Sequence, residues 1–477
     1  MNSRPSTVDA FVLLAIVAAS ASFLVFRLDN PILWIDEIFT TNYIRNGYDF
    51  LLDVGRPDER HPPGHYVLLK AWTVLFGADR VGVRSLSVAW ALICLPLVYF
   101  IVQLRLDRRT ALITAAFLAV FPGFVHYARE ARMYAQVFGL LLLASFFFLY
   151  LFSRFQTLAQ VKRILLTIAF ALALAGTFFT HYISGVYYVC FFAAAMAMAL
   201  FRRDFGWLAY ALAGLTLATL IIIPQLLHML EFVVPSDDEW IPATDLIIFY
   251  SMVSGAYDAP MLTKPILYLV YLAGLILLWR NDKDLFLFVG SFLILGPFLL
   301  AIIGTVRPVL LVRTLQPFTL LAPLLLALVV TRLPWPRVGV ALGLFAVVVN
   351  VSTVSRDFPV KRAYLFAEQA APMLSAVKAP PDAIFYMEHL QPELDLVRID
   401  HTSFVQISFD SMEQDSAAIR AHLNSCVQTR ECGRTLVVLE REPLFEREVG
   451  ARWNAFARSL SPSETVSIED HIIYVYN

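Results

Sequence analysis

Two adjacent carboxylates follow the first apolar run of the chain, in the sequence Trp34-Ile35-Asp36-Glu37. Two acids just beyond such a run must be solvated, paired with cations or bound to a metal ion. A carboxylate in this position could also deprotonate an incoming hydroxyl group. Taken in isolation, a pair of acids is more often an ordinary solvated loop pair, so the other polar residues must decide between these interpretations.

Two histidines follow in the sequence His61-Pro62-Pro63-Gly64-His65-Tyr66. The prolines fix the chain where a helix would begin, because the first helical turn tolerates a missing N–H. Residues four apart share one face of a continuous helix, so His61 and His65 could hold a divalent metal ion with Glu37 nearby. Contact between these histidines and a phosphate group is an equally open alternative.

Arginines dominate the stretch Arg129-Glu130-Ala131-Arg132-Met133-Tyr134, which follows His126-Tyr127. Arg129 and Arg132 are three residues apart, which predicts that both lie on one helical face. A guanidinium fork binds phosphate oxygens better than a lysine does. The alternative is an Arg–Glu pair that anchors a helix at the membrane interface.

Two further polar groups stand near the ends of apolar runs: Thr180-His181-Tyr182, and Arg313, which Arg307 precedes. Each could be a simple interfacial anchor. Interfacial anchors would occur at both membrane faces, however. The topology derived below puts all five polar groups at one face, and this co-location favours a site.

The composition predicts a membrane protein. The chain has 477 residues, of which 59% are hydrophobic and 16% are charged, whereas soluble domains are about half apolar and about a quarter charged. The apolar residues fall in runs of about 17–25, the length that crosses a bilayer. We predict eleven transmembrane spans, near residues 10–27, 81–103, 110–127, 133–152, 163–181, 184–201, 206–229, 263–279, 285–304, 313–331 and 337–354.

Orientation follows from the positive charges in the short loops. With the N-terminus in the cytoplasm, and the first run retained rather than cleaved as a signal peptide, every cytoplasmic turn is basic. These turns carry Arg105, Arg108, Arg109, Arg154, Lys162, Arg163, Arg202, Arg203, Arg280, Lys283, Arg332 and Arg337. The opposite 230–260 loop has no Lys or Arg. The formal net charge of −1 gives no indication of nucleic-acid binding.

One apolar run, residues 61–76, would invert this pattern if it crossed the membrane. We therefore predict a juxtamembrane helix at the outer interface, where Lys70 can extend its charge into water and Trp72 can lie at headgroup level.

Residues 355–477 are predicted to form a separate periplasmic α/β domain, and residues 1–354 the transmembrane domain. Helical patterns cover 360–378, 413–424 and 443–460, and β-rich runs cover 383–387, 435–439 and 473–476. Cys426 and Cys432 could form a disulfide in an oxidising compartment, whereas Cys94 and Cys190 lie in apolar runs.

These features together favour glycosyl transfer from a lipid-linked phosphate. Arginines would hold the phosphate and stabilise it as a leaving group, and a carboxylate would deprotonate the attacking hydroxyl. No Gly-rich phosphate-binding loop is present in the sequence, so no nucleotide cofactor is expected.

The motifs W-x-D-E, H-P-P-x-H-Y, E-A-R-M-Y and T-H-Y resemble those of glycosyltransferase family 39, the bacterial relatives of the dolichyl-phosphate-mannose protein mannosyltransferases. The resemblance covers residues 30–200 well and is thinner up to residue 331. Arg313 and Pro317 look like a reduced form of the family's R-Y-x-x-P element, with Thr314 in place of the Tyr. The C-terminal domain is not covered.

The resemblance implies an all-α polytopic GT-C membrane fold in a bacterial inner membrane. It implies that Asp36 is the base, or positions the acceptor, and that Glu37 supports it or helps to hold a metal ion. His61 falls where related aminoarabinose transferases carry a metal-binding carboxylate. The resemblance places the donor phosphate and sugar near Arg129, Glu130, Arg132, Tyr134, His181, Tyr182 and Arg313. The donor would be a polyprenyl-phosphate sugar and the acceptor a glycan, lipid or protein, with inversion at the anomeric carbon.

Three other functions compete with this interpretation. A transporter or flippase of lipid-linked saccharides would carry ionisable residues near the bilayer midplane, and the predicted span centres are almost free of charge. A polysaccharide polymerase or ligase would have a large arginine-rich outer loop, but the 230–260 loop is acidic. The third alternative is a noncatalytic membrane scaffold.

Overall fold

The computed structural model describes residues 7–29, 33, 35–52, 61–232, 244–256, 264–355, 383–387, 403–407, 417–424, 435–440, 447–468 and 471–476. The predicted helix 360–378, Trp34, Cys426 and Cys432 lie outside these residues. The chain divides into two compact units. The membrane unit comprises Met1–Pro31 and Tyr43–Pro359, and the C-terminal unit comprises Ile32–Asn42 and Val360–Asn477.

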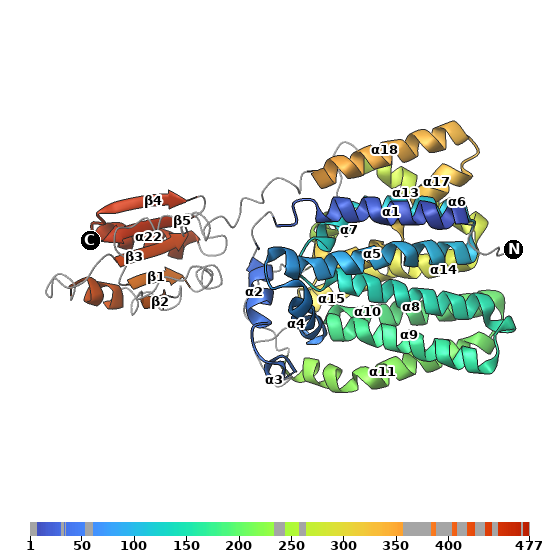
Figure 1. The fold of residues 1–477 in the computed structure, drawn as a ribbon, viewed down its shortest axis with the longest axis horizontal. Coiled ribbons are helices and arrows are strands. Elements are labelled where there is room, and N and C mark those ends of the chain that lie inside the picture. Colours follow the sequence, from blue (N-terminus) through green and yellow to red (C-terminus); the bar gives the residue numbers. More distant parts are fainter. Residues whose placement is uncertain are drawn as a thin grey trace. The chain divides into compact units, whose positions relative to one another are not determined.

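Long apolar helices make up the membrane unit, and Figure 1 shows many of them lying side by side. Among the described residues, eight helices are long and apolar enough to cross a membrane. They are α1 (Thr7–Val25), α5 (Arg80–Arg105), α8 (Tyr134–Arg154, continued by η1 to Thr157), α9 (Gln160–Thr180), α10 (Gly185–Arg202, preceded by η2, Tyr182–Ser184), α11 (Gly206–Phe232), the helix from Lys283 to Val306, and α18 (Pro336–Val354).

Two bent helix pairs raise the number of candidate spans to ten. The first joins α6 (Arg108–Ala119) to α7 (Pro122–Ala128) at 58°, and the second joins Val312–Thr319, which contains α16 (Val312–Leu315) and η4 (Gln316–Thr319), to α17 (Ala322–Arg332) at 42°. A proline lies in the first turn of the later helix of each pair, where its missing N–H is tolerated, and it could not continue a preceding helix. The remaining predicted span, near residues 263–279, corresponds to α13 (Lys264–Asn281), which is helical but is not among these candidates.

The helix from Lys283 to Val306 is not a uniform α-helix. It comprises α14 (Lys283–Gly290), the π-helical segment η3 (Ser291–Leu295) and α15 (Gly296–Val306). The Phe318 ring lies where a side chain at Gly296 would be, since an added Cβ would come within 2.1 Å of it. This glycine therefore lets η4 approach the helix closely.

Short helices complete the membrane unit: α3 (Tyr48–Leu52), α4 (Gly64–Phe76) and α12 (Leu246–Ala256). Helix α4 has 13 residues, or about 20 Å, which is too short to cross a hydrocarbon core of about 30 Å. The prediction that this run does not span is therefore confirmed. The Lys70 ammonium group donates to the Ile44 carbonyl at 3.0 Å, and the Trp72 indole donates to the Ser85 hydroxyl at 2.8 Å.

An aromatic core joins the helices of the bundle. The Phe148 ring on α8 lies 5.6 Å from the rings of Phe170 on α9, Trp207 on α11 and Phe288 on α14, and 5.3 Å from Phe191 on α10. All five side chains are buried. Such pairs contribute about 0.5–1.5 kcal/mol each beyond their area burial, so this core fixes the mutual arrangement of these helices.

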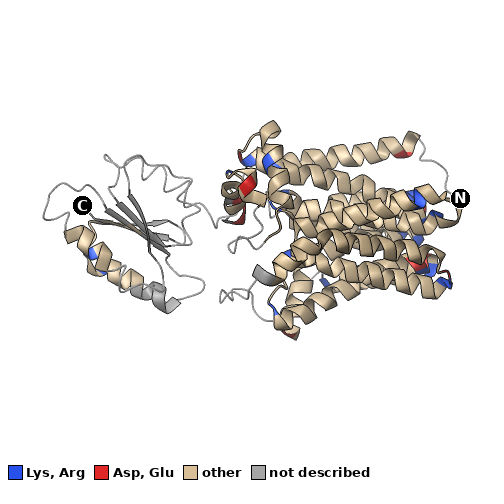
Figure 2. Ribbon diagram, turned by 90° about the horizontal axis from the view of Figure 1, so that it is seen from below, with Lys and Arg blue, Asp and Glu red and all other residues tan. Residues whose placement is uncertain are grey.

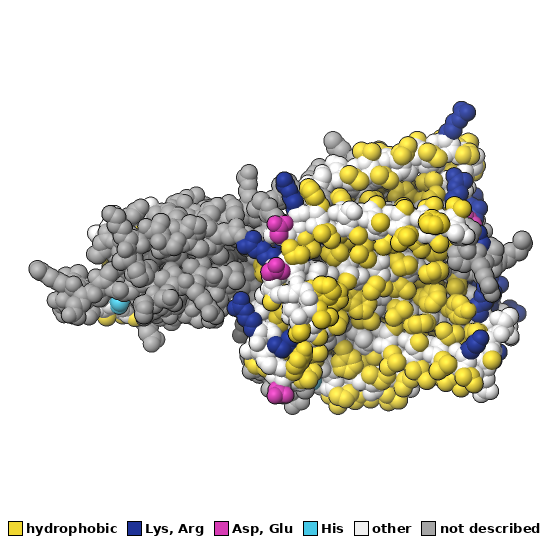
Figure 3. Space-filling model, in the orientation of Figure 1, with side chains coloured by type: hydrophobic (Ala, Val, Ile, Leu, Met, Phe, Trp, Pro, Cys, Tyr) yellow, Lys and Arg dark blue, Asp and Glu magenta, His cyan; other side chains and the backbone are white. Residues whose placement is uncertain are grey.

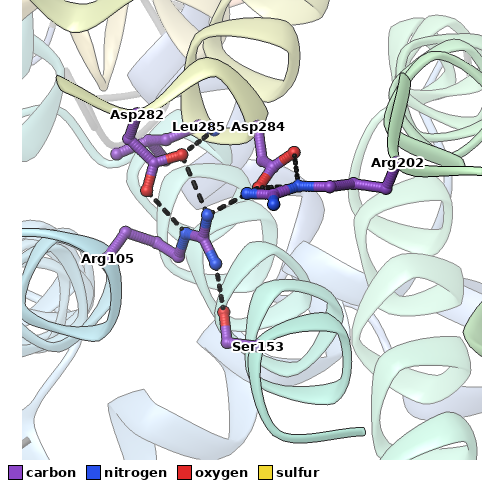
Figure 4. Close-up of polar contacts among 6 residues, drawn as sticks. All are labelled: Arg105, Ser153, Arg202, Asp282, Asp284 and Leu285. Carbon is purple, nitrogen blue, oxygen red and sulfur yellow. Dashed lines mark hydrogen bonds and ion pairs between the residues drawn. The ribbon is translucent and has the colours of Figure 1, made fainter. Parts of the chain in front are cut away.

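Charged side chains of the membrane unit gather at the helix ends (Figure 2), and an apolar belt covers the face seen in Figure 3. At the end that holds the N-terminus of α1, the buried carboxylate of Asp284 accepts from Arg105 at 2.7 Å and from Arg202 at 2.6 Å (Figure 4). Asp282 accepts from Arg105 at 2.9 Å. This network ties α5, α10 and α14 together with no carboxylate or guanidinium left unbalanced.

The C-terminal unit contains a five-stranded mixed sheet with the order β2-β1-β3-β5-β4. Its strands are β1 (Ala383–Met387), β2 (Ser403–Ile407), β3 (Thr435–Glu440), β4 (Glu464–Ile468) and β5 (His471–Tyr476). Strand β1 pairs in parallel with β2 and β3, whereas β5 pairs antiparallel with β3 and β4.

Helix α22 (Arg447–Ser459) precedes β4, and the Tyr474 hydroxyl of β5 donates to Asn454 of this helix at 2.9 Å. The predicted α/β character is confirmed, with β1, β3 and β5 where the sequence predicts them. Strands β2 and β4 were missed.

Candidate active site

A buried hydrogen-bond chain connects α4, α8 and α9. His65 in the first turn of α4 is 1% exposed, and its Nδ1 lies 3.0 Å from Gln136 Oε1. The Gln136 amide nitrogen donates to Thr180 Oγ1 at 3.1 Å, and that hydroxyl donates to the Gly176 carbonyl at 2.7 Å. Since an amide oxygen only accepts, Nδ1 of His65 carries the hydrogen.

Arg132 lies beside the histidine that precedes α4. Its side chain is almost fully buried, and its Nη2 lies 3.3 Å from His61 Nε2. The His61 and His181 ring centroids are 5.2 Å apart, and the His181 and Tyr134 centroids are 6.0 Å apart. The fold thus brings together polar residues from three separate segments. We refer to Arg132, His61, His65 and His181 as the arginine–histidine cluster.

The three histidines of this cluster are held in their neutral form. Burial, followed by the charge of Arg132, lowers the pKa of His181 to about 3. Burial is also the main cause for His65, whose pKa falls to about 4, and for His61, whose pKa lies well below its ordinary value. At neutral pH the cluster therefore combines permanent guanidinium charge with neutral imidazoles that can donate or accept hydrogen bonds.

His181 ends α9 and has a defined tautomer. Its Nδ1 accepts from the Ile183 amide at 3.2 Å, so Nε2 carries the hydrogen. The adjacent Tyr182 hydroxyl accepts from Gln225 of α11 at 2.6 Å. The predicted Thr180-His181-Tyr182 group therefore divides its contacts, with Thr180 bonded to Gln136, His181 in the cluster and Tyr182 bonded to α11.

Arg129 has a different environment from Arg132. Its Nη1 donates to the carbonyl groups of Leu24 and Phe26 at 2.7 and 2.8 Å, and its Nη2 donates to Arg27 at 3.1 Å. The prediction that both arginines lie on one helical face is wrong, because α7 ends at Ala128 and α8 begins only at Tyr134. The intervening break lets the two guanidinium groups point to different partners.

Glu130 and Arg313 were also predicted to bind the donor. Glu130 is buried, and its Oε1 lies 3.1 Å from His126 Nε2. Arg313 of α16 is half-buried, and its charge contributes to the lowered pKa of His61 and of His181, so it lies near the cluster. Thr314 accepts from the Leu311 amide at 3.0 Å and thus caps α16 instead of supplying a phenol to the site.

Asp36 and Glu37 lie in the first turn of α2 (Ile35–Tyr43), most of which belongs to the C-terminal unit. Thr40 and Thr41 donate their hydroxyl groups to the carbonyls of Asp36 and Glu37, both at 2.8 Å. These bonds hold the helical turn that carries both acids. A helix N-terminus also favours negative charge.

The histidines do not fit the predicted metal site. Helix α4 begins at Gly64, so His61 lies before the helix and the pair does not share a helical face. His61 presents Nε2 to a guanidinium group, whose positive charge disfavours a cation at that nitrogen. His65 bonds Gln136 through Nδ1, which leaves Nε2 as its only possible ligand atom. No group of three or more His, Cys, Asp or Glu that could hold a metal ion occurs in the described part of the chain.

Sequence reasoning missed Gln136 and Gln225. Both are buried amides near the ends of apolar helices, at 6% and 4% exposure. Their signal was their residue type, because a buried amide in an apolar helix requires a polar partner. Each partner lies on another helix and could not be identified from sequence spacing.

Comparisons with known proteins agree with this architecture. Residues 60–228 match the family described as dolichyl-phosphate-mannose-protein mannosyltransferase. No curated protein sequence matches the chain. Among solved structures, ArnT from Cupriavidus metallidurans in the apo state has a TM-score of 0.64 at 13% identity, with 98% of each chain covered.

ArnT from the same organism bound to undecaprenyl phosphate also gives 0.64 at 13% identity, with 99% of this chain and 98% of that chain covered. The Archaeoglobus fulgidus oligosaccharyltransferase in complex with Zn and sulfate gives 0.54 at 11% identity, with 94% and 69% covered. The chain therefore has the membrane fold of the GT-C glycosyltransferases, and its residues 60–228 match the dolichyl-phosphate-mannose-protein mannosyltransferase family.

Proposed function

We propose that this protein transfers a sugar from a polyprenyl-phosphate-linked donor to a glycan, lipid or protein of the cell envelope. The observation that carries the proposal is the arginine–histidine cluster, in which a buried guanidinium group stands among three neutral imidazoles. A phosphate monoanion or dianion is the natural partner of such a charge. The apolar exterior of the helices suits the polyprenyl tail.

The donor phosphate would bind at Arg132, with Arg313 as a second cation and the Nε2–H of His181 as a neutral donor. Neutral imidazoles offer hydrogen bonds without adding charge. A guanidinium group already buried in the site stabilises negative charge as it develops on the departing phosphate, with little reorganisation. Tyr134, whose ring lies near His181, is placed to contact the sugar.

The proposed reaction is a single displacement. Asp36 takes the proton of the acceptor hydroxyl, and the resulting oxygen forms a bond to the anomeric carbon. The bond between that carbon and the phosphate oxygen breaks, and its electron pair leaves with the polyprenyl phosphate. The anomeric configuration is inverted. Glu37 supports Asp36 in this scheme.

One related structure supports the donor class, and another contains a metal ion. One similar ArnT structure is a complex with undecaprenyl phosphate, which is the lipid product that the proposed reaction would release. The oligosaccharyltransferase structure contains Zn. We assign no step to a metal ion in this protein, because no group of three or more His, Cys, Asp or Glu that could hold one occurs among the described residues.

We further propose that the protein lies in a bacterial inner membrane with its N-terminus in the cytoplasm. Basic residues in the turns at one end of the helices support this orientation. Residues 1–354 would form the membrane domain, and residues 355–477 would form a periplasmic domain. Acceptor docking is the role we propose for the latter.

Asp36→Asn and Glu37→Gln test the reaction. Purified wild-type protein in lipid vesicles should release polyprenyl phosphate from a polyprenyl-phosphate sugar in the presence of an acceptor extract. D36N should abolish release and retain donor binding, while E37Q should retain part of the activity. Full activity in D36N, with folding verified by thermal unfolding, would disprove the role of Asp36.

A further inference from the structure

The guanidinium group of Arg129 holds the end of α1. It donates to four backbone carbonyl groups between residues 23 and 27. The distances are 3.4 Å to Phe23, 2.7 Å to Leu24, 2.8 Å to Phe26 and 3.1 Å to Arg27. The last carbonyl groups of a helix have no partner within the helix, and a cation is favoured at that end. Arg129 meets both requirements from the α7–α8 break.

The backbone leaves α1 through a residue in the left-handed conformation. Arg27 has φ 51°, a left-handed conformation that a residue with a side chain seldom adopts. The next residue, Leu28, is held by a second arginine, because Arg84 of α5 is 3% exposed and donates to the Leu28 carbonyl at 2.9 Å. Two arginines from different segments therefore fix the point at which the chain leaves α1.

The end of α1 and the α7–α8 break each lie close in the sequence to a residue of the proposed site. Asp36, the proposed base, lies eight residues after Leu28, and Arg132, the proposed phosphate ligand, lies three residues after Arg129. The short break between α7 and α8 thus carries the guanidinium group of the arginine–histidine cluster and a second guanidinium group that holds the end of α1.

We propose that Arg129 is a positioning residue, which fixes the end of α1 from which the chain continues to Asp36. The proposal rests on the proposed function. Arg129 would act through the backbone of residues 23–27 and would not touch the donor. Arginine suits this task because its planar fork directs several donors in fixed geometry, whereas lysine offers a single compact charge.

The test compares four variants of the full-length protein in lipid vesicles. Arg129→Gln removes the fork and the charge, and Arg129→Lys keeps the charge alone. Arg27→Gly is the matched control, since it removes one cation from the same end of α1 but keeps the carbonyl group and permits φ above zero. Arg132→Gln marks the behaviour of a phosphate ligand.

The measurements are the Kd for undecaprenyl phosphate, kcat for sugar transfer, and hydrogen exchange of the amides of residues 23–28. R129Q should lower kcat at least about tenfold, because small displacements of a reacting group are costly. Its Kd should stay within about twofold of wild type, because the guanidinium group of Arg129 donates to backbone carbonyl groups at the end of α1. R129K should lie between wild type and R129Q, and R27G should match wild type.

Several results would overturn the proposal. Donor binding that falls in R129Q as in R132Q would place Arg129 in the phosphate site. If kcat is unchanged in both Arg129 variants, the contacts between Arg129 and the end of α1 are not needed for sugar transfer. If R27G loses as much kcat as R129Q, the effect comes from the lost positive charge and not from these contacts. If R129Q fails to fold, R129K alone decides by the same criteria.

Failure of the proposed function would look different. In that case wild-type protein neither binds undecaprenyl phosphate nor transfers sugar. Hydrogen exchange would still test whether Arg129 holds the end of α1. If it does, the amides of residues 23–28 should exchange faster in R129K than in R27G, whether or not the protein transfers sugar.

Discussion

Replacing Arg132 by Gln tests the phosphate-binding role of the cluster. The variant removes a guanidinium group that is 4% exposed and lies 3.3 Å from His61 Nε2. The three neighbouring histidines are neutral at physiological pH and cannot replace its charge. Arg313 would then be the remaining cation known to influence the cluster.

The magnitude follows from the kind of contact that is lost. A hydrogen bond to a charged group contributes about 1.5–3 kcal/mol. Loss of about 2–3 kcal/mol from donor binding corresponds to a Kd raised by about 30–150-fold. R132K keeps a charge but loses the fork, so its Kd should rise by a smaller factor.

Binding of undecaprenyl phosphate to purified protein in detergent or lipid nanodiscs measures this change. The histidines provide an independent readout, since the charge of Arg132 contributes to the lowered pKa of His61, His65 and His181. In R132Q these pKa values should rise, yet stay below 6.5 because burial is the first cause. Wild-type affinity in R132Q would refute the assignment of Arg132 as the phosphate ligand.

Acid should destabilise the membrane unit, because His65 and His181 have folded-state pKa values of about 4 and about 3, below the ordinary 6.5. As the pH falls, the histidines of the unfolded chain are protonated before those of the folded protein. The free energy of unfolding is therefore highest above pH 6.5 and decreases as the pH falls toward the folded-state pKa values. An unfolding temperature that is unchanged down to about pH 5 would contradict this. Gly64→Ala should weaken donor binding by displacing the start of α4, since the added Cβ would lie 2.5 Å from the Phe179 carbonyl oxygen; Gly47→Ala, with no atom within 4 Å, is the control. Asp284→Asn should lower the free energy of unfolding by about 1.5–3 kcal/mol, because it removes the charge of a buried carboxylate that Arg105 and Arg202 share, although Arg105 keeps Asp282 and Arg202 is exposed to solvent. An unchanged unfolding temperature would argue against that network. EDTA should leave the Kd for undecaprenyl phosphate unchanged, and a chelator-dependent Kd would show that a metal ion takes part.

The membrane helices and several residues of the cluster were predictable from the sequence. Apolar runs of sufficient length identify helices by themselves, since the bilayer requires every backbone group to be bonded internally. The motif around Arg132 and the histidines before α4 were also recognisable. Their meeting was predicted only as co-location at one membrane face.

The division of roles within the site was not predictable. Three-residue spacing made Arg129 and Arg132 equivalent, but the break before Tyr134 gave them different partners. The i,i+4 spacing of His61 and His65 suggested a metal site, but the helix began at Gly64. In both cases the position of a helix end decided the outcome, and helix ends are set by tertiary packing as much as by local sequence. Strands β2 and β4 were missed because short strands carry little periodic signal.

The most direct test of sugar transfer follows the fate of the donor lipid. Purified protein is reconstituted in vesicles with a polyprenyl-phosphate sugar and an acceptor extract, and the lipids are analysed by mass spectrometry. The proposed function predicts that free polyprenyl monophosphate appears in equal amount to transferred sugar, and that D36N abolishes both. Movement of intact donor across the bilayer without its consumption would contradict it and would favour a transporter of lipid-linked saccharides.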